Sequence, residues 1–293
     1  MKTILLIGKN GQVGWELQNT LLPLGRVVAL DRTQMDLTQP DAIRKAMRDL
    51  TPDIIVNAAG YTAVDKAEQE PELAMQVNGV APGILAEETK RINALLVHYS
   101  TDYVFDGTHA EAYTEEDTPN PVNLYGKSKL EGERAIVAVN CSHLILRTSW
   151  IYSSRGTNFV LTMLRLARGE KEIAVVDDQI GSPTAARELA RTTSALLGKL
   201  NASEERADVF HLSASGSASR FAFAKAIIEI AKQHSITPSG WATVRATTTE
   251  NYPLPAARPL NASTCKEKIM RVFGIEMTTW EHQLNEYLKE IIL

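Results

Sequence analysis

The sequence predicts an α/β fold, in which a parallel sheet wound with helices on both faces is followed by a smaller C-terminal lobe. Short apolar runs alternate with helix-length segments through the first half of the 293-residue chain. A glycine-rich turn follows the first of these runs, and the spacing of the segments changes after Trp150. This pattern is typical of a doubly wound, Rossmann-type sheet, which binds ligands beyond the carboxyl ends of its strands.

The first strand and the first helix are predicted on either side of the glycine-rich turn. Residues 3–7 form an apolar run that ends at Gly8, as expected of a buried parallel strand. Gly11 and Gly14 follow at intervals of three, and residues 13–22 have helical character. Glycines here permit a tight turn and let the backbone approach a pyrophosphate at the helix N-terminus. The spacing is GxxGxxG rather than the usual GxGxxG, but the strand–turn–helix context favours a dinucleotide site over a non-binding turn.

The second strand, predicted at residues 26–30, delivers Asp31 and Arg32 at its C-terminal end. A carboxylate there can accept hydrogen bonds from both ribose hydroxyls of NAD, whereas an adjacent arginine can pair with the 2′-phosphate of NADP. Asp36 and Leu37 lie just beyond a turn, where the adenine is expected. The choice between the two cofactors stays open, and loop solvation is the alternative role for both acids.

Three more strands and two more helices complete the predicted sheet domain. The strands are expected at residues 54–57, 95–100 and 143–147, and the helices at residues 71–92 and 125–140. Polar or small residues follow each strand, namely Gly8, Asp31, Asn57 to Ala59, Ser100 to Asp102 and Thr148 to Trp150. Because parallel strands share one carboxyl edge, we expect these groups to converge on a single site.

Tyr125 and Lys129 stand four residues apart on a predicted helix, which places both side chains on one face. A free phenol titrates near pH ~10 and exchanges protons poorly at neutral pH. A cation beside it favours the phenolate and lowers its pKa. The spacing therefore predicts an acid/base unit, with a solvated helix face as the alternative.

Composition excludes several other classes of protein. Hydrophobic residues make up 44% of the chain, enough for a sizeable core, yet no apolar run approaches the ~20 residues that span a bilayer. The net charge of −4 gives no electrostatic footprint for nucleic acid. The N-terminus carries no secretory signal pattern, and Cys141 and Cys265 lie outside any motif. We therefore expect a cytoplasmic protein with free thiols and no membrane or nucleic-acid partner. The six histidines show no metal-ligand spacing, and His98 is expected to be a packed strand residue.

The C-terminal half is expected to be a smaller, interwoven lobe. We assign residues 1–150 to a dinucleotide-binding domain and residues 151–293 mainly to a substrate-binding lobe, some segments of which return to the sheet. The last segment is predicted to be an amphipathic helix that opens with a capping box over residues 278–281. Its apolar stripe, expected to be core, consists of Leu284, Tyr287, Leu288 and Ile291.

At the level of motifs the whole chain resembles the dTDP-4-dehydrorhamnose reductases, a family of the extended short-chain dehydrogenase/reductase superfamily. The YxxxK pattern marks only the superfamily, whereas the TDYVF and RTSWIY segments are much more specific to this family. The matching segments are residues 8–14, 57–59, 62–68, 99–107, 123–133, 147–152, 178–184 and 257–263.

The resemblance implies reduction of the C4 keto group of dTDP-4-dehydro-L-rhamnose to dTDP-L-rhamnose by NADPH or NADH, a step toward cell-surface polysaccharides. Tyr125 would be the proton donor, Thr101 would hydrogen-bond near the C4 oxygen, and Lys129 would hold the nicotinamide ribose. The implied substrate contacts are Thr101, Asp102, Trp150 and Arg258, although Trp150 could be an ordinary core residue and Arg258 a surface salt bridge. The implied cofactor contacts are Gly8, Gly11, Gln12, Val13, Gly14, Asp31, Arg32, Asp36, Leu37, Ala58, Ala59, Gly60, Tyr125 and Lys129.

Two other functions compete with this reading. A nucleotide-sugar dehydratase commonly has glutamate after the Thr-Asp pair, where this chain has Tyr103. That difference favours simple reduction, although an epimerase is not excluded directly. Related chains also serve as non-catalytic regulatory subunits that bind nucleotide and a partner enzyme. Such subunits can lose the catalytic set, which is complete here as Thr101, Tyr125 and Lys129.

Some positions depart from the pattern of the family. Gly60 stands where alanine is common, and Thr264 and Cys265 replace an expected apolar residue, which weakens the carry-over at that end of the substrate pocket. Glu16 and Glu188 resemble acidic positions that bind magnesium at a subunit contact in some relatives. Exposed helix acids are the preferred interpretation, so no metal is assigned, Mg²⁺ stays open, and a homodimer is one expected assembly.

Overall fold

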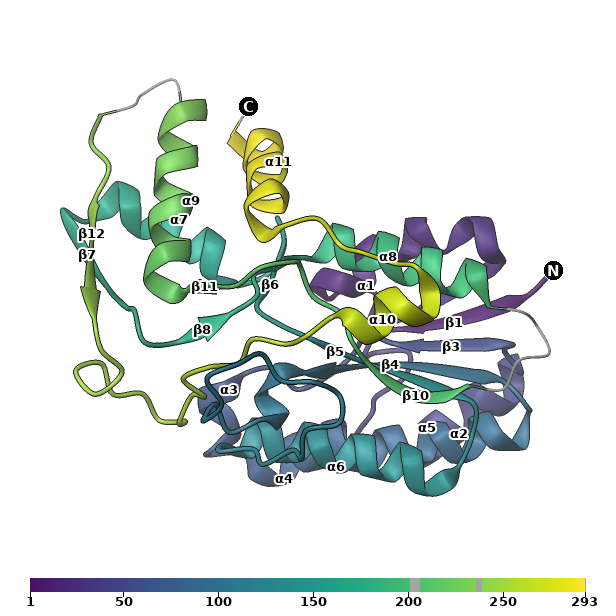
Figure 1. The fold of residues 1–293 in the computed structure, drawn as a ribbon. Helices are drawn as coiled ribbons and strands as arrows, with labels where there is room; N and C mark the ends of the chain where they lie inside the picture. The colour runs from purple at the N-terminus through teal and green to yellow at the C-terminus, as the bar shows by residue number, and fades with distance from the viewer. Residues whose placement is uncertain (201–205, 236–238, 293) are drawn as a thin grey trace.

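The computed structural model describes residues 1–200, 206–235 and 239–292, and its centre is a six-stranded sheet (Figure 1). All neighbouring strands of this sheet run parallel. Their order across the sheet is β10 (Ala207–His211), β5 (His143–Thr148), β4 (Leu95–Thr101), β3 (Ile54–Asn57), β1 (Thr3–Ile7) and β2 (Arg26–Leu30). The predicted doubly wound α/β class is confirmed.

Helices cover both faces of the sheet, as Figure 1 shows. One face packs against α1 (Gln12–Thr20), α8 (Ala186–Lys199) and α10 (Glu267–Phe273). The other face packs against α2 (Pro40–Leu50), α5 (Ala81–Arg91) and α6 (Leu124–Val139). Successive residues of β1 alternate between the two cores, with Ile4 and Leu6 in one and Leu5 and Ile7 in the other. This alternation explains why the strand is apolar throughout.

The strands agree closely with the prediction, because buried apolar runs between turns leave little freedom in their bounds. The predicted bounds of β1, β2 and β3 are those observed, and β4 and β5 each extend one residue further, to Thr101 and Thr148. The helix expected over residues 71–92 is instead interrupted between α4 (Pro71–Met75) and α5 by a π-helical turn (Gln76–Val80).

Pro82 and Gly132 account for that π-helical turn. Pro82 has no N–H to offer the carbonyl of Asn78, four residues earlier, so the α-helical pattern fails at this point. Gly132 of α6 lies against the same carbonyl, at a distance where an added Cβ would stand 2.1 Å from the oxygen. The turn places the Asn78 side chain to donate to the Tyr61 carbonyl (2.9 Å) and the Ser128 hydroxyl (3.0 Å). It thereby joins the loop after β3 to α6.

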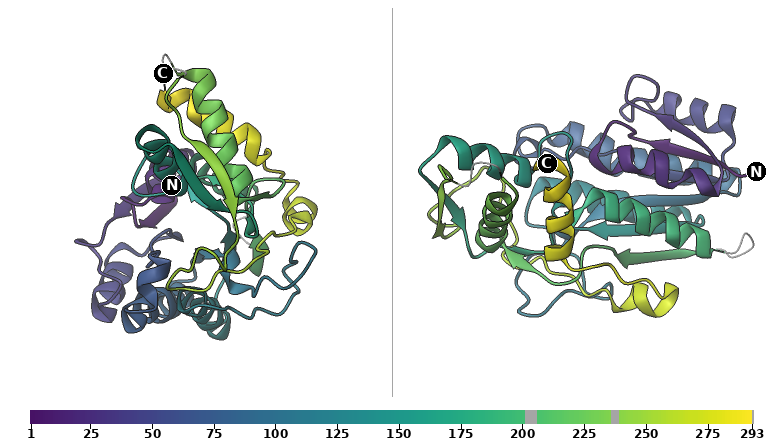
Figure 2. Two further views of the ribbon diagram at one scale, coloured as in Figure 1. Left: turned by 90° about the vertical axis from the view of Figure 1, so that its left-hand side faces the viewer. Right: turned by 90° about the horizontal axis from the view of Figure 1, so that it is seen from above.

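A second lobe stands beyond the carboxyl ends of the strands (Figures 1 and 2). Its core lies between α7 (Phe159–Gly169), α9 (Arg220–His234) and α11 (Trp280–Ile292), with β7 (Glu172–Val176) pairing parallel to β12 (Thr243–Thr247). Short two-residue strands connect the lobe to the sheet domain, namely β6 (Ile151–Tyr152), β8 (Ile180–Gly181), β9 (Thr184–Ala185) and β11 (Ala218–Ser219). After Trp150 the chain returns to the large sheet as α8 against α1, as β10 beside β5 and as α10 on the face that α8 covers.

Helix α11 begins one residue later than its predicted capping box requires. The Thr279 hydroxyl accepts from the His282 N–H at 3.4 Å, while the Thr278 carbonyl is taken by the Ser215 N–H at 3.1 Å. The cap is therefore Thr279, and the prediction of a box from Thr278 was wrong. The stripe of Leu284, Tyr287, Leu288 and Ile291 packs into the core of the second lobe, as predicted.

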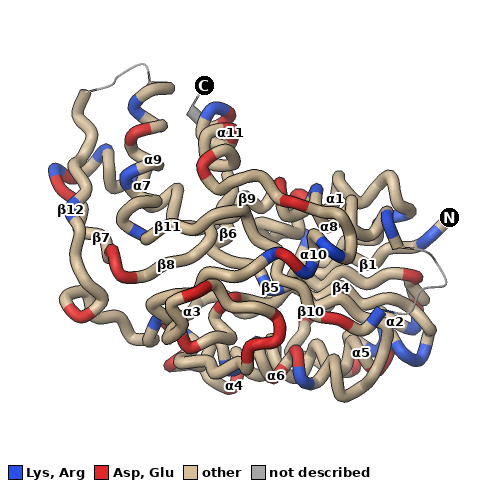
Figure 3. The backbone as a smooth tube through the Cα atoms, viewed as in Figure 1, with Lys and Arg blue, Asp and Glu red and all other residues tan. Residues whose placement is uncertain are grey.

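Acidic and basic residues are not separated into different regions of the described structure. Acidic and basic residues are interspersed over the sheet domain and the second lobe (Figure 3). Among the described helices, none combines the length and the hydropathy needed to cross a bilayer. Cys141 and Cys265 are both free thiols, and Cys141 is buried.

Candidate active site

Two adjoining cavities lie at the carboxyl edge of the sheet. The first has a volume of about 760 Å³ and the second about 310 Å³. Their linings share the start of α1 and the loop after β3, including Gln12, Val13, Ala58, Ala59 and Gly60. A ligand in the first cavity can therefore reach a ligand in the second.

The first cavity gathers most of the residues predicted to bind the cofactor. Gly8, Gly11, Asp31, Arg32, Asp36 and Leu37 line it, together with the shared residues named above. The turn before α1 owes its shape to two glycines. Gly8 has φ +89°, and a Cβ on Gly14 would stand 2.0 Å from the Gly8 carbonyl oxygen. Gly14 is outside the lining and instead lets α1 pack directly under the turn.

Asp31 is held as a carboxylate at the rim of the first cavity. Its oxygens accept from the Thr33 hydroxyl (2.6 Å) and from Asn10 (3.3 Å), and Lys9 forms an ion pair at 3.2 Å. Hydrogen bonds from Thr33, and then from Lys9, lower the pKa of Asp31 to about 2. Arg32 is 74% exposed in its side chain, and Asp36, at 3.4 Å, is its one ionic partner among the described residues. The rim of the first cavity therefore presents the hydrogen-bonded carboxylate of Asp31 beside the exposed guanidinium of Arg32.

The second cavity gathers the predicted catalytic residues. Thr101, Asp102, Tyr125, Lys129 and Trp150 all line it. Thr101 ends β4, Asp102 begins the short 3-10 helix that follows, and Tyr125 lies in the first turn of α6. That turn is capped by Asn123, whose side chain accepts from the Gly126 N–H at 2.7 Å. A Cβ on Gly126 would stand 2.2 Å from the Tyr103 carbonyl oxygen, so glycine lets α6 approach β4.

Tyr125 holds its proton at neutral pH in this structure. Burial raises the pKa of Tyr125 well above its usual value, and a hydrogen bond with Thr101 acts in the opposite direction. Its ring meets the Tyr103 ring edge-on, with centroids 5.9 Å apart. A neutral phenol facing a cavity is a proton donor in position.

Lys129 does not lower the pKa of Tyr125 here, which differs from the expectation based on their spacing. Its ammonium nitrogen donates to the Tyr99 carbonyl oxygen at 2.5 Å and lies 3.3 Å from His98 Nε2. The side chain is therefore directed toward β4. Burial lowers the pKa of Lys129 itself to about 8, with Glu133 acting in the opposite direction.

The contacts of His98 determine which of its ring nitrogens carries the proton and faces Lys129. The Asn57 side-chain oxygen accepts from the Ala59 N–H at 3.2 Å, which leaves its amide nitrogen facing His98 Nδ1 at 3.1 Å. Nδ1 must then accept, so the hydrogen-bond network assigns the imidazole proton to Nε2, opposite Lys129. An Nε2–H group can donate a hydrogen bond to the neutral amine of Lys129, but it has no acceptor in the ammonium form. His98 is a buried strand residue, as predicted.

Asp102 is a second buried ionisable group of this cavity. It accepts from the Ser149 hydroxyl at 2.6 Å and from the Thr101 hydroxyl at 3.0 Å. Burial raises the pKa of Asp102 to about 6, although both hydrogen bonds and the charge of Arg220 act in the opposite direction. The carboxyl therefore titrates close to neutral pH.

Trp150 lies in the cavity wall in a strained conformation. Its φ of +42° is in the left-handed region, which a bulky residue rarely adopts. Gly181 leaves room for the indole, because an added Cβ there would stand 2.4 Å from its ring. The Arg220 guanidinium lies over the ring, 3.5 Å from its centroid. Trp150 thus supports an arginine and does not present a bare apolar wall.

Arg258 is not brought into either cavity lining. It forms a two-bond ion pair with Asp65, at 2.7 and 2.8 Å, and also donates to the Ala256 carbonyl oxygen at 2.5 Å. In this structure Asp65 binds two nitrogens of the guanidinium, while the direct substrate contact stays a prediction. The alternative, a salt bridge, is the arrangement observed.

Comparison with known proteins places the chain. The model of the family described as "RmlD substrate binding domain" matches residues 1–292. The chain belongs to this family. It is 43% identical to a dTDP-4-dehydrorhamnose reductase of Burkholderia thailandensis, with 99% of each chain covered. It is 41% identical to that of Escherichia coli K12, over 98% of this chain and 97% of the other. The crystal structure of a dTDP-4-dehydrorhamnose reductase from Bacillus anthracis in complex with NADP superposes with a TM-score of 0.90, at 35% identity and 99% coverage of each chain.

Two features of the site were not predicted from the sequence. Arg220 opens α9, and nothing in the sequence connects it with Trp150, 70 positions earlier. Asn57 and His98 were each placed on a predicted strand, but their contact with one another depends on side-chain geometry. An arginine before an apolar helix and a histidine inside an apolar strand are common, so neither carried a usable signal.

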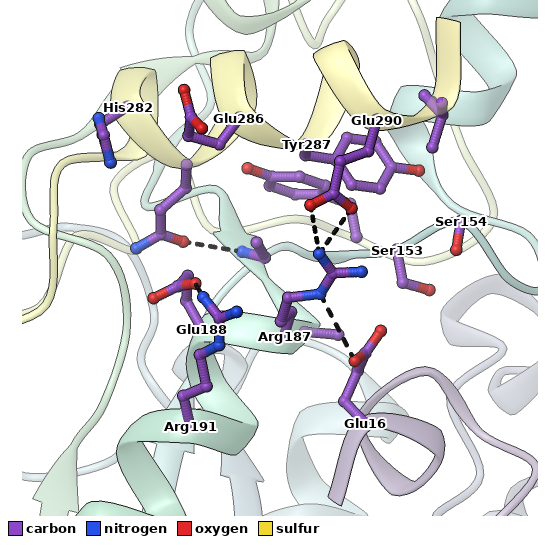
Figure 4. Close-up of a pocket in the computed structure, with 15 residues that line it drawn as sticks. Glu16, Ser153, Ser154, Arg187, Glu188, Arg191, His282, Glu286, Tyr287 and Glu290 are labelled. Carbon is purple, nitrogen blue, oxygen red and sulfur yellow. Dashed lines mark hydrogen bonds and ion pairs between the residues drawn. The ribbon is translucent and has the colours of Figure 1, made fainter. Parts of the chain in front are cut away.

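Glu16 and Glu188, the acidic positions compared with a magnesium site above, both pair with arginines in this structure. Glu16 and Glu188 line a third cavity, of about 340 Å³, between α8 and α11 (Figure 4). Arg187 pairs with Glu16 at 3.7 Å and with Glu290 at 2.5 Å, while Arg191 pairs with Glu188 at 2.7 Å. Arginines thus supply the positive charge. Within the described residues no cluster of three or more histidine, cysteine or acidic side chains could hold a metal ion.

Proposed function

We propose that the protein reduces the C4 keto group of dTDP-4-dehydro-L-rhamnose to give dTDP-L-rhamnose, with NADPH as the reductant. The observation that carries the proposal is the neutral phenol of Tyr125 in a cavity that opens into the dinucleotide-sized cavity at the glycine-rich turn. Membership of the family supports it, since relatives similar over their full length are dTDP-4-dehydrorhamnose reductases and one was solved with NADP.

Each step falls to a residue of the second cavity. NADPH in the first cavity supplies a hydride to C4, so negative charge develops on the C4 oxygen. Tyr125 protonates that oxygen, and Thr101 donates a hydrogen bond to it, which stabilises charge where it forms. Lys129 would turn from the Tyr99 carbonyl to hold the nicotinamide ribose. Asp102 would accept hydrogen bonds from sugar hydroxyls.

The competing functions are less well supported. Tyr103 follows Asp102 where a dehydratase would need an acid, and its ring packs on Tyr125. A regulatory subunit would not need Thr101, Tyr125 and Lys129 around one cavity.

The reduction is tested by following the absorbance of NADPH and of NADH with enzymatically generated dTDP-4-dehydro-L-rhamnose. No oxidation of either, by folded protein that binds nucleotide, would reject the proposal in favour of another keto sugar or the regulatory role.

Location and assembly extend the proposal. We place the protein in the cytoplasm because both cysteines are free thiols, as a reducing compartment would keep them.

A homodimer is the assembly that the resemblance suggests, and sedimentation equilibrium of the purified chain measures it directly. A single species of monomer mass at enzyme-assay concentrations would exclude the dimer.

Arg32 is expected to select NADPH over NADH. Its side chain is exposed at the rim of the first cavity and pairs with Asp36 at 3.4 Å, so it can turn toward a 2′-phosphate. Replacing Arg32 with alanine should weaken NADPH binding by about 10–100-fold, as for the loss of charge-assisted hydrogen bonds, and leave NADH binding unchanged. Fluorescence titration of both nucleotides measures this. Arg134→Ala, on the exposed face of α6, is the control, and equal losses for both nucleotides would contradict the assignment.

Asp102 is expected to give the reaction an acidic limb. Burial raises the pKa of Asp102 to about 6, so the carboxylate that would accept sugar hydroxyls is lost as the pH falls through that value. The kcat/KM for the keto sugar should therefore decrease below about pH 6 and level off above it. Asp102→Asn should remove this limb and leave NADPH binding intact. A limb at the same pH in the variant would assign it to another group.

A further inference from the structure

Arg220 presents a guanidinium to the second cavity without a carboxylate partner. Arg220 is the first residue of α9, and its backbone N–H donates to the Gln179 carbonyl at 3.1 Å. Its side chain lines the cavity together with Tyr125 and Asp102. Over residues 1–200, 206–235 and 239–292, no carboxylate oxygen lies within 4.0 Å of this guanidinium. A partly buried arginine is usually paired, so this one lacks the negative charge that its position calls for.

Aromatic contacts hold the guanidinium in one orientation. It lies 3.5 Å over the centroid of Trp150 and 5.1 Å from that of Phe159. Trp150 is itself immobilised, because its backbone is in the left-handed region and Gly181 packs against its ring. The N–H groups of a guanidinium lie in its plane, so stacking leaves them available at the edges for a planar or forked acceptor. The arginine is therefore pre-oriented for a ligand.

No carboxylate in the described surroundings of Arg220 forms an ion pair with it, although a second arginine lies near. Burial lowers the pKa of Arg220, and the positive charge of Arg258 lowers it further. Tyr103 and Asp102 act in the opposite direction and raise it. Asp65 compensates Arg258, through the ion pair at 2.7 Å, but does not compensate Arg220. Asp102 accepts from Ser149 and Thr101, and its carboxylate acts on Arg220 through charge alone, without an ion pair within 4.0 Å in the described residues. An anionic ligand would supply the missing negative charge.

We propose that Arg220 binds the diphosphate of the nucleotide-sugar substrate, with its in-plane N–H groups donating to phosphate oxygens. The inference rests on the proposed function for the identity of the substrate. It moves the diphosphate contact from Arg258, whose guanidinium Asp65 already binds, to an arginine that is stacked on Trp150 and has no carboxylate partner among the described residues. Arg258 would then add to the positive field without direct contact.

The test compares binding of dTDP and of thymidine, which lacks the phosphates, by isothermal titration calorimetry. Arg220→Gln should weaken dTDP by about 10–100-fold, as for hydrogen bonds to a charged group, and leave thymidine unchanged. Arg220→Lys should fall between the two proteins, because it keeps the charge and loses the forked geometry. Arg168→Gln removes another arginine stacked on a tryptophan, 3.7 Å from the centroid of Trp241 and outside the second cavity, and should leave dTDP binding unchanged.

Two results would overturn the inference. Unchanged dTDP binding in Arg220→Gln would show that Arg220 does not contact the diphosphate. Equal losses for dTDP and thymidine would show that Arg220 acts only by shaping the cavity. The binding readout is separate from turnover. Dependence of dTDP binding on Arg220 in a protein that does not reduce the keto sugar would keep this inference and reject the proposed reaction. Normal reduction with unchanged dTDP binding in Arg220→Gln would do the reverse.

Discussion

Replacing Tyr125 with phenylalanine is expected to lower kcat by at least ~10²-fold, because general acid catalysis contributes ~10²–10⁴-fold. The hydroxyl is the proton donor in the second cavity, and burial keeps the pKa of Tyr125 above its usual value, so the proton is present throughout the neutral range. Phenylalanine preserves the edge-on contact with Tyr103. The loss should therefore be one of chemistry and not of fold.

Steady-state rates with dTDP-4-dehydro-L-rhamnose and a separate titration with NADPH distinguish the two. Binding of NADPH should stay close to that of the parent protein, while kcat and kcat/KM fall together. Tyr252→Phe, at an exposed tyrosine, is the matched control and should be fully active. Turnover of Tyr125→Phe near the parental rate would remove Tyr125 from the mechanism.

The second large effect is expected on stability, at the buried ion pair between Glu133 of α6 and Arg147 of β5. Arg147 donates to both carboxylate oxygens, at 2.7 and 3.0 Å, and the two side chains are 5% and 4% exposed. The Ser100 hydroxyl also donates to Glu133. Replacing Arg147 with methionine should reduce the free energy of unfolding by about 3–5 kcal/mol, because a buried carboxylate is left without its counter-ion.

A double variant makes this prediction specific. In Arg147→Met with Glu133→Gln both charges are gone, and the glutamine oxygen can still accept from Ser100. Most of the loss should therefore be recovered, since removing a whole buried pair is often close to neutral. Urea unfolding of the parent, both single variants and the double variant gives the coupling energy. Additive losses would mean that the pair is not coupled as its geometry indicates.

The strands and the turn of the sheet domain could be predicted from sequence because their signals are local. An apolar run bounded by Gly8 specifies a buried strand, and the glycines at 8 and 14 are required by a positive φ and by direct packing on a carbonyl. Convergence of the strand ends on one edge follows from parallel order alone. The predicted residues of both cavities therefore lie where this reasoning places them, apart from Gly14, which packs beneath the turn, and Arg258.

Helical details were less predictable because they depend on neighbouring elements. The π-helical turn at 76–80 depends on Pro82 and on the approach of Gly132 from α6, 50 or more positions later in the chain. The cap of α11 passed to Thr279 because the carbonyl of Thr278 is bound by Ser215 from another segment. Spacing rules consider one segment at a time and do not include such partners.

By itself the sequence determined the doubly wound sheet, the glycine-rich turn and the membership of Thr101, Tyr125 and Lys129 in one site. Tertiary structure alone decided which partner each ionisable group meets. Lys129 faces His98 and Tyr99, Arg258 faces Asp65, and Arg220 is left stacked on Trp150 without a counter-ion. The physical reason is that secondary structure follows from short-range periodicity, whereas pairing and burial of charge depend on distances between residues far apart in the chain.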